Sequence, residues 1–320
     1  MTSILDRTRL PPWAPLAAVA VATAGTAAWV HHQARRAEQR HAAPGKFIHL
    51  DGVRLHYRIV GDGPAVLLVH GNTVHGNDFD ASGLLRRLAR NHRVLVIDRP
   101  GFGWSDRTRD RLWTPAEQAR LLCRAAVALG IENFAVVGHS LGTQVALAMA
   151  LGDPAHVNRL VLVGGYYFPS FRLDVVSPEL GAIPWFGDAM RYTFASLASR
   201  LLLGPTVRAL FAPQPVPASF DEELPRELLL RPLQQRATSE DGAHMVTQAR
   251  VLKAHYQDLK VPVTLVAGAQ DTIVDSRSQS GRLHHVLPHS RLHILDGVGH
   301  MAHYHAQELI ATAVAAPLPE

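Results

Sequence analysis

A serine flanked by two glycines occupies the short stretch Gly138-His139-Ser140-Leu141-Gly142. A strand-like apolar run precedes it, and the run TQVALAMAL that follows is typical of a helix. A sharp turn from strand into helix exposes a side chain at the sheet edge. Such a turn needs small residues two positions before and after, because neighbouring backbone crowds in. This spacing predicts that Ser140 is a nucleophile. A helix N-cap, the alternative role for Ser140, would not need a glycine on each side.

The helix predicted after Ser140 would assist such a nucleophile. The first amides of a helix point out of its N-terminus, and the helix dipole adds partial positive charge there. An oxyanion formed when Ser140 attacks a carbonyl would lie at this point. We therefore expect the backbone amide of Leu141 to stabilise the oxyanion, and the pattern indicates acyl chemistry at a serine.

The composition limits the kind of protein that carries this stretch. The 320 residues are 47% hydrophobic and 18% charged, which is typical of a globular protein with a sizeable core. The formal net charge is +5, and no basic stripe with interleaved aromatic residues is present, so we expect no nucleic-acid partner. The single cysteine, Cys123, cannot form an internal disulfide and is interpreted as a core thiol on a helix.

From about residue 46 the sequence alternates between strand-like and helix-like segments. Asp51-Gly52 separates two strand-like runs and predicts a two-residue hairpin. Helical patterns between the later strands, among them Thr114 to Gly130, predict an α/β fold with a mainly parallel sheet and helices on both faces. The predicted strands lie in KFIHL, VRLHYRIV, AVLLVHG, RVLVID, NFAVVG, NRLVLVGG, VPVTLVAG and SRLHILDG.

The alternation is interrupted between about residues 168 and 245. The strand signal disappears there, and short helical patterns separated by prolines take its place. Long insertions inside compact domains are usually functional, so we interpret this one as a helical lid over a site. The alternative is a helical elaboration that only packs on the sheet.

From Lys46 onward the sequence resembles the α/β-hydrolase fold family. The resemblance implies a mostly parallel eight-stranded sheet, helices on both faces and a helical lid. AGAQD and DGVGH end two late strands, so the resemblance implies a catalytic triad in the family's chain order Ser140, Asp271, His300. VHGN ends an earlier strand and implies that the amide of Asn72 joins that of Leu141 in the oxyanion hole. DRPGFGWSD, residues 98–106, resembles the family's loop after the next strand.

Both partners of Ser140 have rivals nearby. Asp275 lies four positions after Asp271 and is interpreted as a turn residue. His300 is preferred among the histidines of this segment because it alone leaves a strand and enters a helix. A metal site is disfavoured because the histidine spacing does not fit one helical face, so we expect no metal and no organic cofactor. The competing histidines are His293, His303 and His305.

The expected function is hydrolysis of a small or medium carboxylic ester through an acyl-enzyme. A serine at position 140 argues against the aspartate-dependent haloalkane dehalogenase and epoxide hydrolase branches that the family also contains. Acyl transfer to an alcohol, C–C bond hydrolysis and cofactor-free perhydrolysis would use the same triad and stay open. A non-catalytic binding protein is the remaining alternative, and it would not need an intact triad.

The N-terminus has a different character from the rest of the chain. After a tail over residues 1–12, residues 13–30 form an uncharged stretch bounded by Trp13 and Trp29. Its length and the terminal tryptophans predict a single-pass membrane anchor. A cleaved signal peptide with secretion of the product is the alternative, since Ala22-Thr23-Ala24 resembles a cleavage site, and a surface helix is another. Residues 31–45 are predicted to be a polar linker, and residues 46–320 the hydrolase domain.

Overall fold

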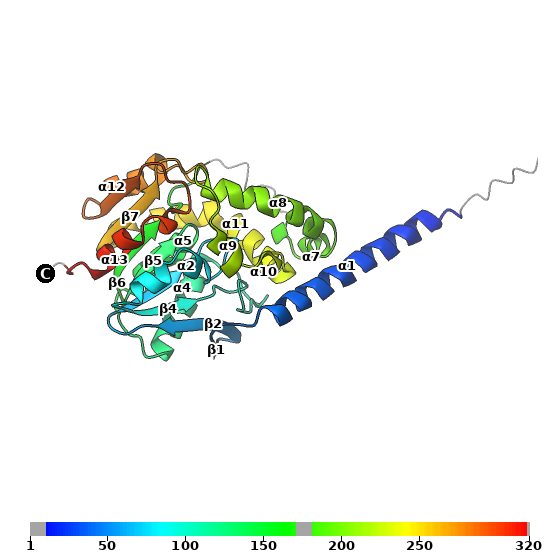
Figure 1. The fold of residues 1–320 in the computed structure, drawn as a ribbon, viewed down its shortest axis with the longest axis horizontal. Coiled ribbons are helices and arrows are strands. Elements are labelled where there is room, and N and C mark those ends of the chain that lie inside the picture. The colour runs from blue at the N-terminus through cyan, green and yellow to red at the C-terminus, as the bar shows by residue number, and fades with distance from the viewer. Residues whose placement is uncertain (1–10, 171–180, 319–320) are drawn as a thin grey trace, which may run out of the picture.

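The computed structural model describes residues 11–170 and 181–318, and its centre is one sheet with helices on both sides (Figure 1). The sheet has eight strands in the order β1-β2-β4-β3-β5-β6-β7-β8. Every strand overlaps a segment predicted from sequence, with β5 and β6 each extending one residue beyond it, so the predicted α/β architecture is confirmed. The strands are β1 (Lys46–Leu50), β2 (Val53–Val60), β3 (Ala65–Val69), β4 (Arg93–Ile97), β5 (Phe134–His139), β6 (Val157–Val163), β7 (Val263–Gly268) and β8 (Arg291–Leu295).

The first two strands are antiparallel, and the remaining pairs are parallel apart from the junction of β2 with β4. Asp51 and Gly52 join β1 to β2 with positive φ angles of 53° and 76°, as a type I′ hairpin requires. From β3 the chain first moves to β4 on one side and then to β5 on the other. The order of the parallel strands thus reverses at β3 and β5, and in open α/β sheets ligands bind outside the carboxyl ends of strands at such a point.

Two apolar cores cover the two faces of the sheet, because alternate residues of each strand point to opposite sides. Leu67 and Val136 belong to one core, and their neighbours Leu68 and Val137 to the other. The first core is completed by α4 (Pro115–Ala128), α5 (Gly142–Gly152) and α12 (Arg282–Val286), and the second by α3 (Leu84–Leu88) and α13 (Gln307–Ala315). Shorter elements are α2 (Asp78–Ala81), η1 (Tyr256–Asp258), η2 (Arg277–Gly281) and η3 (Ala302–Tyr304).

Helices occupy the insertion between β6 and β7. Its last helix continues to Lys253, past the predicted lid boundary at residue 245, because Ala249 and Leu252 are buried and prolong its packed face. Residues 171–180 of the predicted lid lie outside the described part of the chain. The helices are α7 (Phe186–Arg191), α8 (Phe194–Phe211), α9 (Ala218–Glu223), α10 (Arg226–Leu229) and α11 (Pro232–Lys253).

A long helix, α1 (Ala14–Arg40), projects from the body at the end where α7 and α10 lie (Figure 1). It does not stop at residue 30, so most of the segment predicted as a linker is helical. Alanine, glutamine, arginine and glutamate favour helix there, and the insertion supplies partners. Ala37 is buried, Glu38 pairs with Arg231 at 3.0 Å, and Arg40 pairs with Glu227 at 3.0 Å.

Candidate active site

Ser140 lies on the predicted sharp turn between β5 and α5, with a φ of 51°. That backbone region is strained for a residue with a side chain. The two flanking glycines explain how the turn fits. A Cβ on Gly142 would overlap the carbonyl oxygens of Val69 and His70, and a Cβ on Gly138 would lie 2.8 Å from the carbonyl oxygen of Gly142. The turn therefore depends on both glycines.

The structure brings Ser140, His300 and Asp271 into one hydrogen-bonded line. His300 lies in the loop between β8 and η3, and its Nε2 is 2.8 Å from the Oγ of Ser140. Its Nδ1 is 2.8 Å from Oδ2 of Asp271, which follows β7. The His300 and Asp271 side chains are almost fully buried, whereas Ser140 is half-buried. Water is therefore kept from the acid and the imidazole.

Asp271 is fixed in place by its other oxygen. Oδ1 accepts hydrogen bonds from the amides of Ile273 and Val274, both at 2.8 Å. The amides hold the carboxylate so that Oδ2 faces His300, and an acceptor opposite Nδ1 favours the His300 tautomer that carries its proton on Nδ1. Asp275 instead accepts from the amide of Ser278 at 2.7 Å.

The rival histidines lie apart from Ser140. His303 Nε2 is 3.0 Å from Oδ2 of Asp78. The other oxygen of Asp78, Oδ1, accepts a hydrogen bond from the hydroxyl of Tyr304. His305 is exposed, and His293 is part of β8. The imidazole that reaches Ser140 is thus that of His300.

Asp78, His139 and His303 form a buried cluster behind the triad, with possible ligand atoms within 4.8 Å of one another. The carboxylate of Asp78 already accepts from His303 and Tyr304, so the cluster is a hydrogen-bonded network. His139 Nε2 lies 3.3 Å from the carbonyl oxygen of His300, which links the network to the triad backbone.

The two predicted oxyanion donors lie on adjacent strand ends at the reversal point of the sheet. A Cβ on Gly71 would be 3.1 Å from Cβ of Ser140, so the loop that carries Asn72 lies against Ser140. In residues 11–170 and 181–318, neither the Asn72 amide nor the Leu141 amide donates to a protein acceptor. Both amides are free to bind a developing negative charge.

Arg99 holds this loop through two backbone carbonyls. Its Nε donates to the carbonyl oxygen of His70 at 3.0 Å, and its Nη2 donates to that of Gly71 at 2.9 Å. Burial, together with the charge of Arg99, lowers the pKa of His70 to about 3. The neutral imidazole accepts the Arg99 amide at Nε2, 2.9 Å away, and can donate from Nδ1 to the carbonyl of Gly71. The loop is therefore fastened by side chain and backbone.

Helix α11 of the insertion also fastens this loop. Asp241 pairs with Arg99 at 2.5 Å, and Asn72 donates through Nδ2 to the carbonyl oxygen of Thr238. Gln234 donates to the carbonyl of Thr73, a β-branched residue with an unusual φ of 70°. Sequence patterns predicted none of these α11 residues. An acid in a polar stretch of a helix has no local signal that distinguishes a buried partner from a solvated one.

Replacing Asp241 with asparagine should destabilise the protein by about 3–5 kcal/mol, because the change leaves the buried Arg99 without its anion and removes the buried one of the two carboxylates that pair with Arg107. Arg99 and Arg107 both contact Asp241, and all three side chains are fully buried. Burial opposes ionisation of Asp241, but the two arginines outweigh it and lower its pKa. Ionised Asp241 therefore makes its full contribution to the free energy of unfolding above the pKa of an unfolded aspartate, about 3.9. This contribution is lost as the pH falls through the lower folded-state pKa.

Urea unfolding at pH 7 measures the loss in the free energy of unfolding. The difference in this free energy between wild type and Asp241→Asn should become smaller in strong acid. Glu240→Gln is the matched control. Glu240 also pairs with Arg107, but its side chain is 26% exposed, so we expect a loss below about 1 kcal/mol. Equal losses of unfolding free energy in the two variants would show that the buried ion pairs of Asp241 stabilise the fold no more than the partly exposed pair of Glu240.

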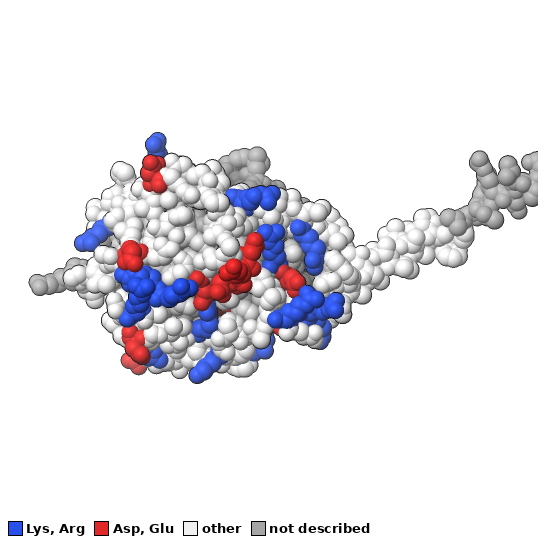
Figure 2. All heavy atoms as spheres, in the orientation of Figure 1, with Lys and Arg blue, Asp and Glu red and all other residues white. Residues whose placement is uncertain are grey.

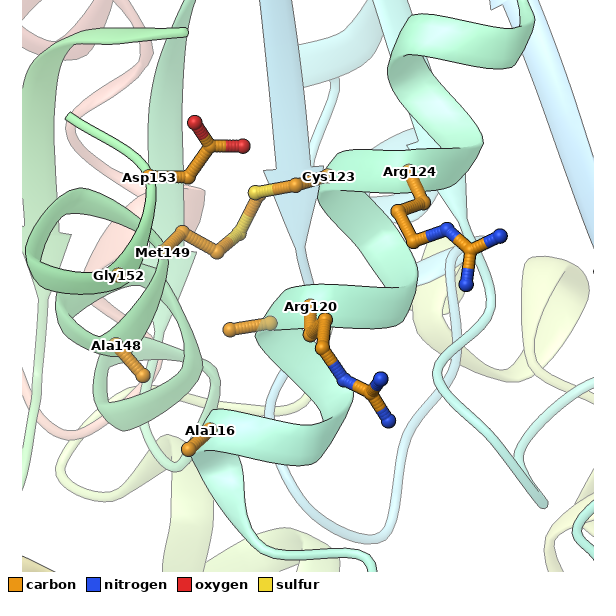
Figure 3. A pocket seen from close by; sticks show the side chains of 9 residues that line it. Ala116, Arg120, Cys123, Arg124, Ala148, Met149, Gly152 and Asp153 are labelled. Carbon is orange, nitrogen blue, oxygen red and sulfur yellow. The ribbon is translucent and has the colours of Figure 1, made fainter. Parts of the chain in front are cut away.

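A separate cavity of about 290 Å³ lies between α4 and α5 (Figure 3). Cys123, Met149 and several alanines line it, and Asp153 lies at its edge. Burial raises the pKa of the Cys123 thiol to about 12, so this thiol stays protonated, as expected for a core cysteine. None of the residues that line this cavity is Ser140, His300 or Asp271, so the cavity is separate from the candidate active site.

Residues 64–306 match the alpha/beta hydrolase fold family. The chain is 30% identical over 246 residues to the putative carbamate hydrolase RutD of Cronobacter sakazakii, covering 72% of this chain and 85% of that protein. It is 26% identical over 280 residues to 2-hydroxymuconate semialdehyde hydrolase of Pseudomonas putida, covering 87% and 95%. An alpha/beta hydrolase fold protein from Burkholderia ambifaria superposes with a TM-score of 0.71 at 22% identity, covering 86% and 98%. With most of its length matched and its strand order and serine turn agreeing, this chain belongs to the alpha/beta hydrolase fold family.

Proposed function

We propose that this protein is a serine hydrolase that cleaves a carboxylic ester with Ser140 as nucleophile, His300 as base and Asp271 as the orienting acid. The observation that carries the proposal is the unbroken line from Asp271 through His300 to Ser140, with 2.8 Å at each step. A serine that served only to cap a helix would not need a strained φ or a buried imidazole on its Oγ.

The reaction follows from the donors and acceptors at the site. His300 Nε2 takes the proton of Ser140 as Oγ attacks the carbonyl carbon, and Asp271 stabilises the imidazolium. The oxyanion accepts hydrogen bonds from the amides of Asn72 and Leu141, each worth about 3 kcal/mol to the transition state. His300 then gives its proton to the leaving alcohol, and a water molecule activated by the same histidine releases the acid from Ser140.

The relatives favour a second candidate, attack on a carbamate or on the ketone carbonyl of a C–C hydrolase substrate. Both reactions start with a polarised carbonyl next to a nucleophile and use the same oxyanion donors. A substrate panel separates the candidates: activated esters of increasing acyl length, a carbamate, and a vinylogous diketone. Fastest turnover of the esters supports our proposal. If the esters were not cleaved while the carbamate or the diketone was, the ester assignment would be wrong and the triad would stand.

We also propose that α1 anchors the protein in a membrane as a single span. Among the described residues it is the one helix long and apolar enough to cross a bilayer, by length and composition. Eighteen residues from Trp13 to Val30 extend about 27 Å along a helix, close to the thickness of a bilayer core of about 30 Å.

The full-length protein should therefore sediment with membranes and resist extraction with alkaline carbonate. Val19→Arg combined with Val21→Arg should abolish this, since each arginine at the centre of a span costs about 2.5–3.5 kcal/mol. His32→Arg, which adds a charge outside the apolar stretch, is the matched control and should still sediment. A mature protein whose intact mass starts near Gly25 would identify a signal peptide instead.

A further inference from the structure

A group of large apolar side chains is exposed on α7, on α8 and just before α7. Trp185, just before α7, is 87% exposed, and Leu201 on α8 is 79% exposed. Single exposed apolar residues are ordinary, but several on one short segment mark an interaction surface. We call this surface the apolar lid face, and it consists of Trp185, Phe186, Phe194, Leu197, Leu201 and Leu202.

The arrangement of α8 explains why these side chains are not part of the core. Phe194, Leu197 and Leu201 follow one another at helical spacing and form an outward stripe. Leu203 and Val207 form another stripe that is buried in the body. A helix that is apolar on two sides is normally covered on both. Here the body covers only one side.

Trp185 is held outward by its own backbone. Its φ of 65° is unusual for a residue with a bulky side chain, and the side chain has almost no protein contact to offset the strain. Tryptophan is a residue that membrane interfaces accommodate well, because its ring is apolar and its N–H can reach water.

Helices α7 and α8, next to or on which the apolar lid face lies, are at the end of the body from which α1 leaves (Figure 1). The guanidinium of Arg200 on α8 lies 4.7 Å from the ring centre of Trp29 on α1. Val30, the last residue of the apolar stretch, is buried. The body therefore contacts α1 within its apolar stretch as well as after it. A bilayer that contains this stretch must reach the level of α8.

Arginines surround the same end of the body, and Figure 2 shows basic side chains where α1 joins it. Arg35 and Arg36 follow the apolar stretch of α1, and Arg208 and Arg226 approach one another next to Gly204 of α8. Guanidinium groups at the level of lipid headgroups attract anionic phosphates. Apolar side chains with arginines beside them match the layered chemistry of a membrane surface.

We propose that the apolar lid face docks into the interfacial layer of the bilayer that α1 enters, with anionic lipids as its partner. The body then has two attachments to the membrane, and the insertion that carries this surface is in contact with lipid. This inference rests on the proposed membrane span of α1 and not on the proposed ester chemistry.

The test uses the full chain in phosphatidylcholine vesicles containing phosphatidylglycerol, with a thiol-linked polarity-sensitive fluorophore at a single position. Leu201→Cys reports on the apolar lid face and Val21→Cys on the span. Ile294→Cys is the matched control, an exposed apolar residue on β8 at the opposite edge of the sheet. Cys123 is buried with a raised pKa, so unmodified wild type gives the labelling background. A nitroxide on the lipid quenches only probes in contact with lipid.

We expect the probes at 201 and 21 to shift to the blue and lose most of their emission to the lipid nitroxide, and the probe at 294 to do neither. If the lipid nitroxide quenched the probe at position 21 while the probe at position 201 behaved like the one at position 294, the docking proposal would be wrong and the membrane span would stand. No quenching at either position would refute both. A probe at 201 shielded from an aqueous quencher but untouched by the lipid nitroxide would show that a second protein copy covers this surface, which also overturns the proposal.

Discussion

Ser140→Ala should reduce ester hydrolysis by about 10⁶-fold in kcat, the loss seen when a triad loses its nucleophile. The protein should remain folded, because alanine has a Cβ like serine and bears the positive φ of 51° at a similar cost. Neither flanking glycine changes, so the close approach of Gly142 to β3 is kept. The measurement is the initial rate with an activated ester, alongside the circular dichroism spectrum of the variant.

The matched control for this variant is Ser199→Ala, a half-buried serine on α8 outside the proposed triad, which should retain its activity. A fluorophosphonate should label wild type at Ser140, as mapped by mass spectrometry, and should not label the Ser140→Ala protein. Labelling of another serine, or an alanine variant that keeps most of its turnover, would refute the nucleophile assignment.

Asp271→Asn should lower kcat by about 10⁴-fold while the substrate KM changes little. An asparagine amide facing His300 Nδ1 would favour the tautomer with its proton on Nε2, and that nitrogen could no longer accept the proton of Ser140. The side-chain oxygen of asparagine can still accept from the amides of Ile273 and Val274, so the loop should keep its shape. The kcat of both proteins is compared between pH 6 and 9.

Asp275→Asn is the natural control, because Asp275 is the same residue type four positions away and contacts the Ser278 amide instead of His300. Its activity should stay close to that of wild type. If Asp275→Asn were the more damaging change, the orienting acid would have to be Asp275. Two mild effects would mean that His300 needs no carboxylate partner here.

Much of the fold could be predicted because it depends on short-range patterns. The strands at AVLLV and NFAVVG were recognisable as continuous apolar runs, since both faces of a central parallel strand are buried. Thr114 was recognisable as the start of α4, and it accepts a hydrogen bond from the amide of Glu117 as an N-cap should. Such signals arise among residues a few positions apart, so the sequence itself carries them.

The boundaries of α1 and α11 could not be predicted in the same way. Residues 31–40 read as polar, yet they are helical because Ala37, Glu38 and Arg40 find partners on the insertion. Likewise α11 runs to Lys253 because its final turns pack on the body. Helices of this kind are stabilised by tertiary packing more than by local propensity, so their ends follow the partner surface.

By itself the sequence determined the serine turn, because a strained strand-to-helix junction needs glycines at fixed positions beside the nucleophile. Its resemblance to the hydrolase family also indicated the strand ends that would present Asn72, Asp271 and His300 as candidates. The tertiary structure alone decided the contacts around these residues. Asp241 pairs with Arg99, and His303 hydrogen-bonds to Asp78 instead of Ser140. These pairs are 142 and 225 positions apart in the chain. Which side chains meet over such separations depends on how the whole sheet and its insertion pack, and no local pattern encodes that.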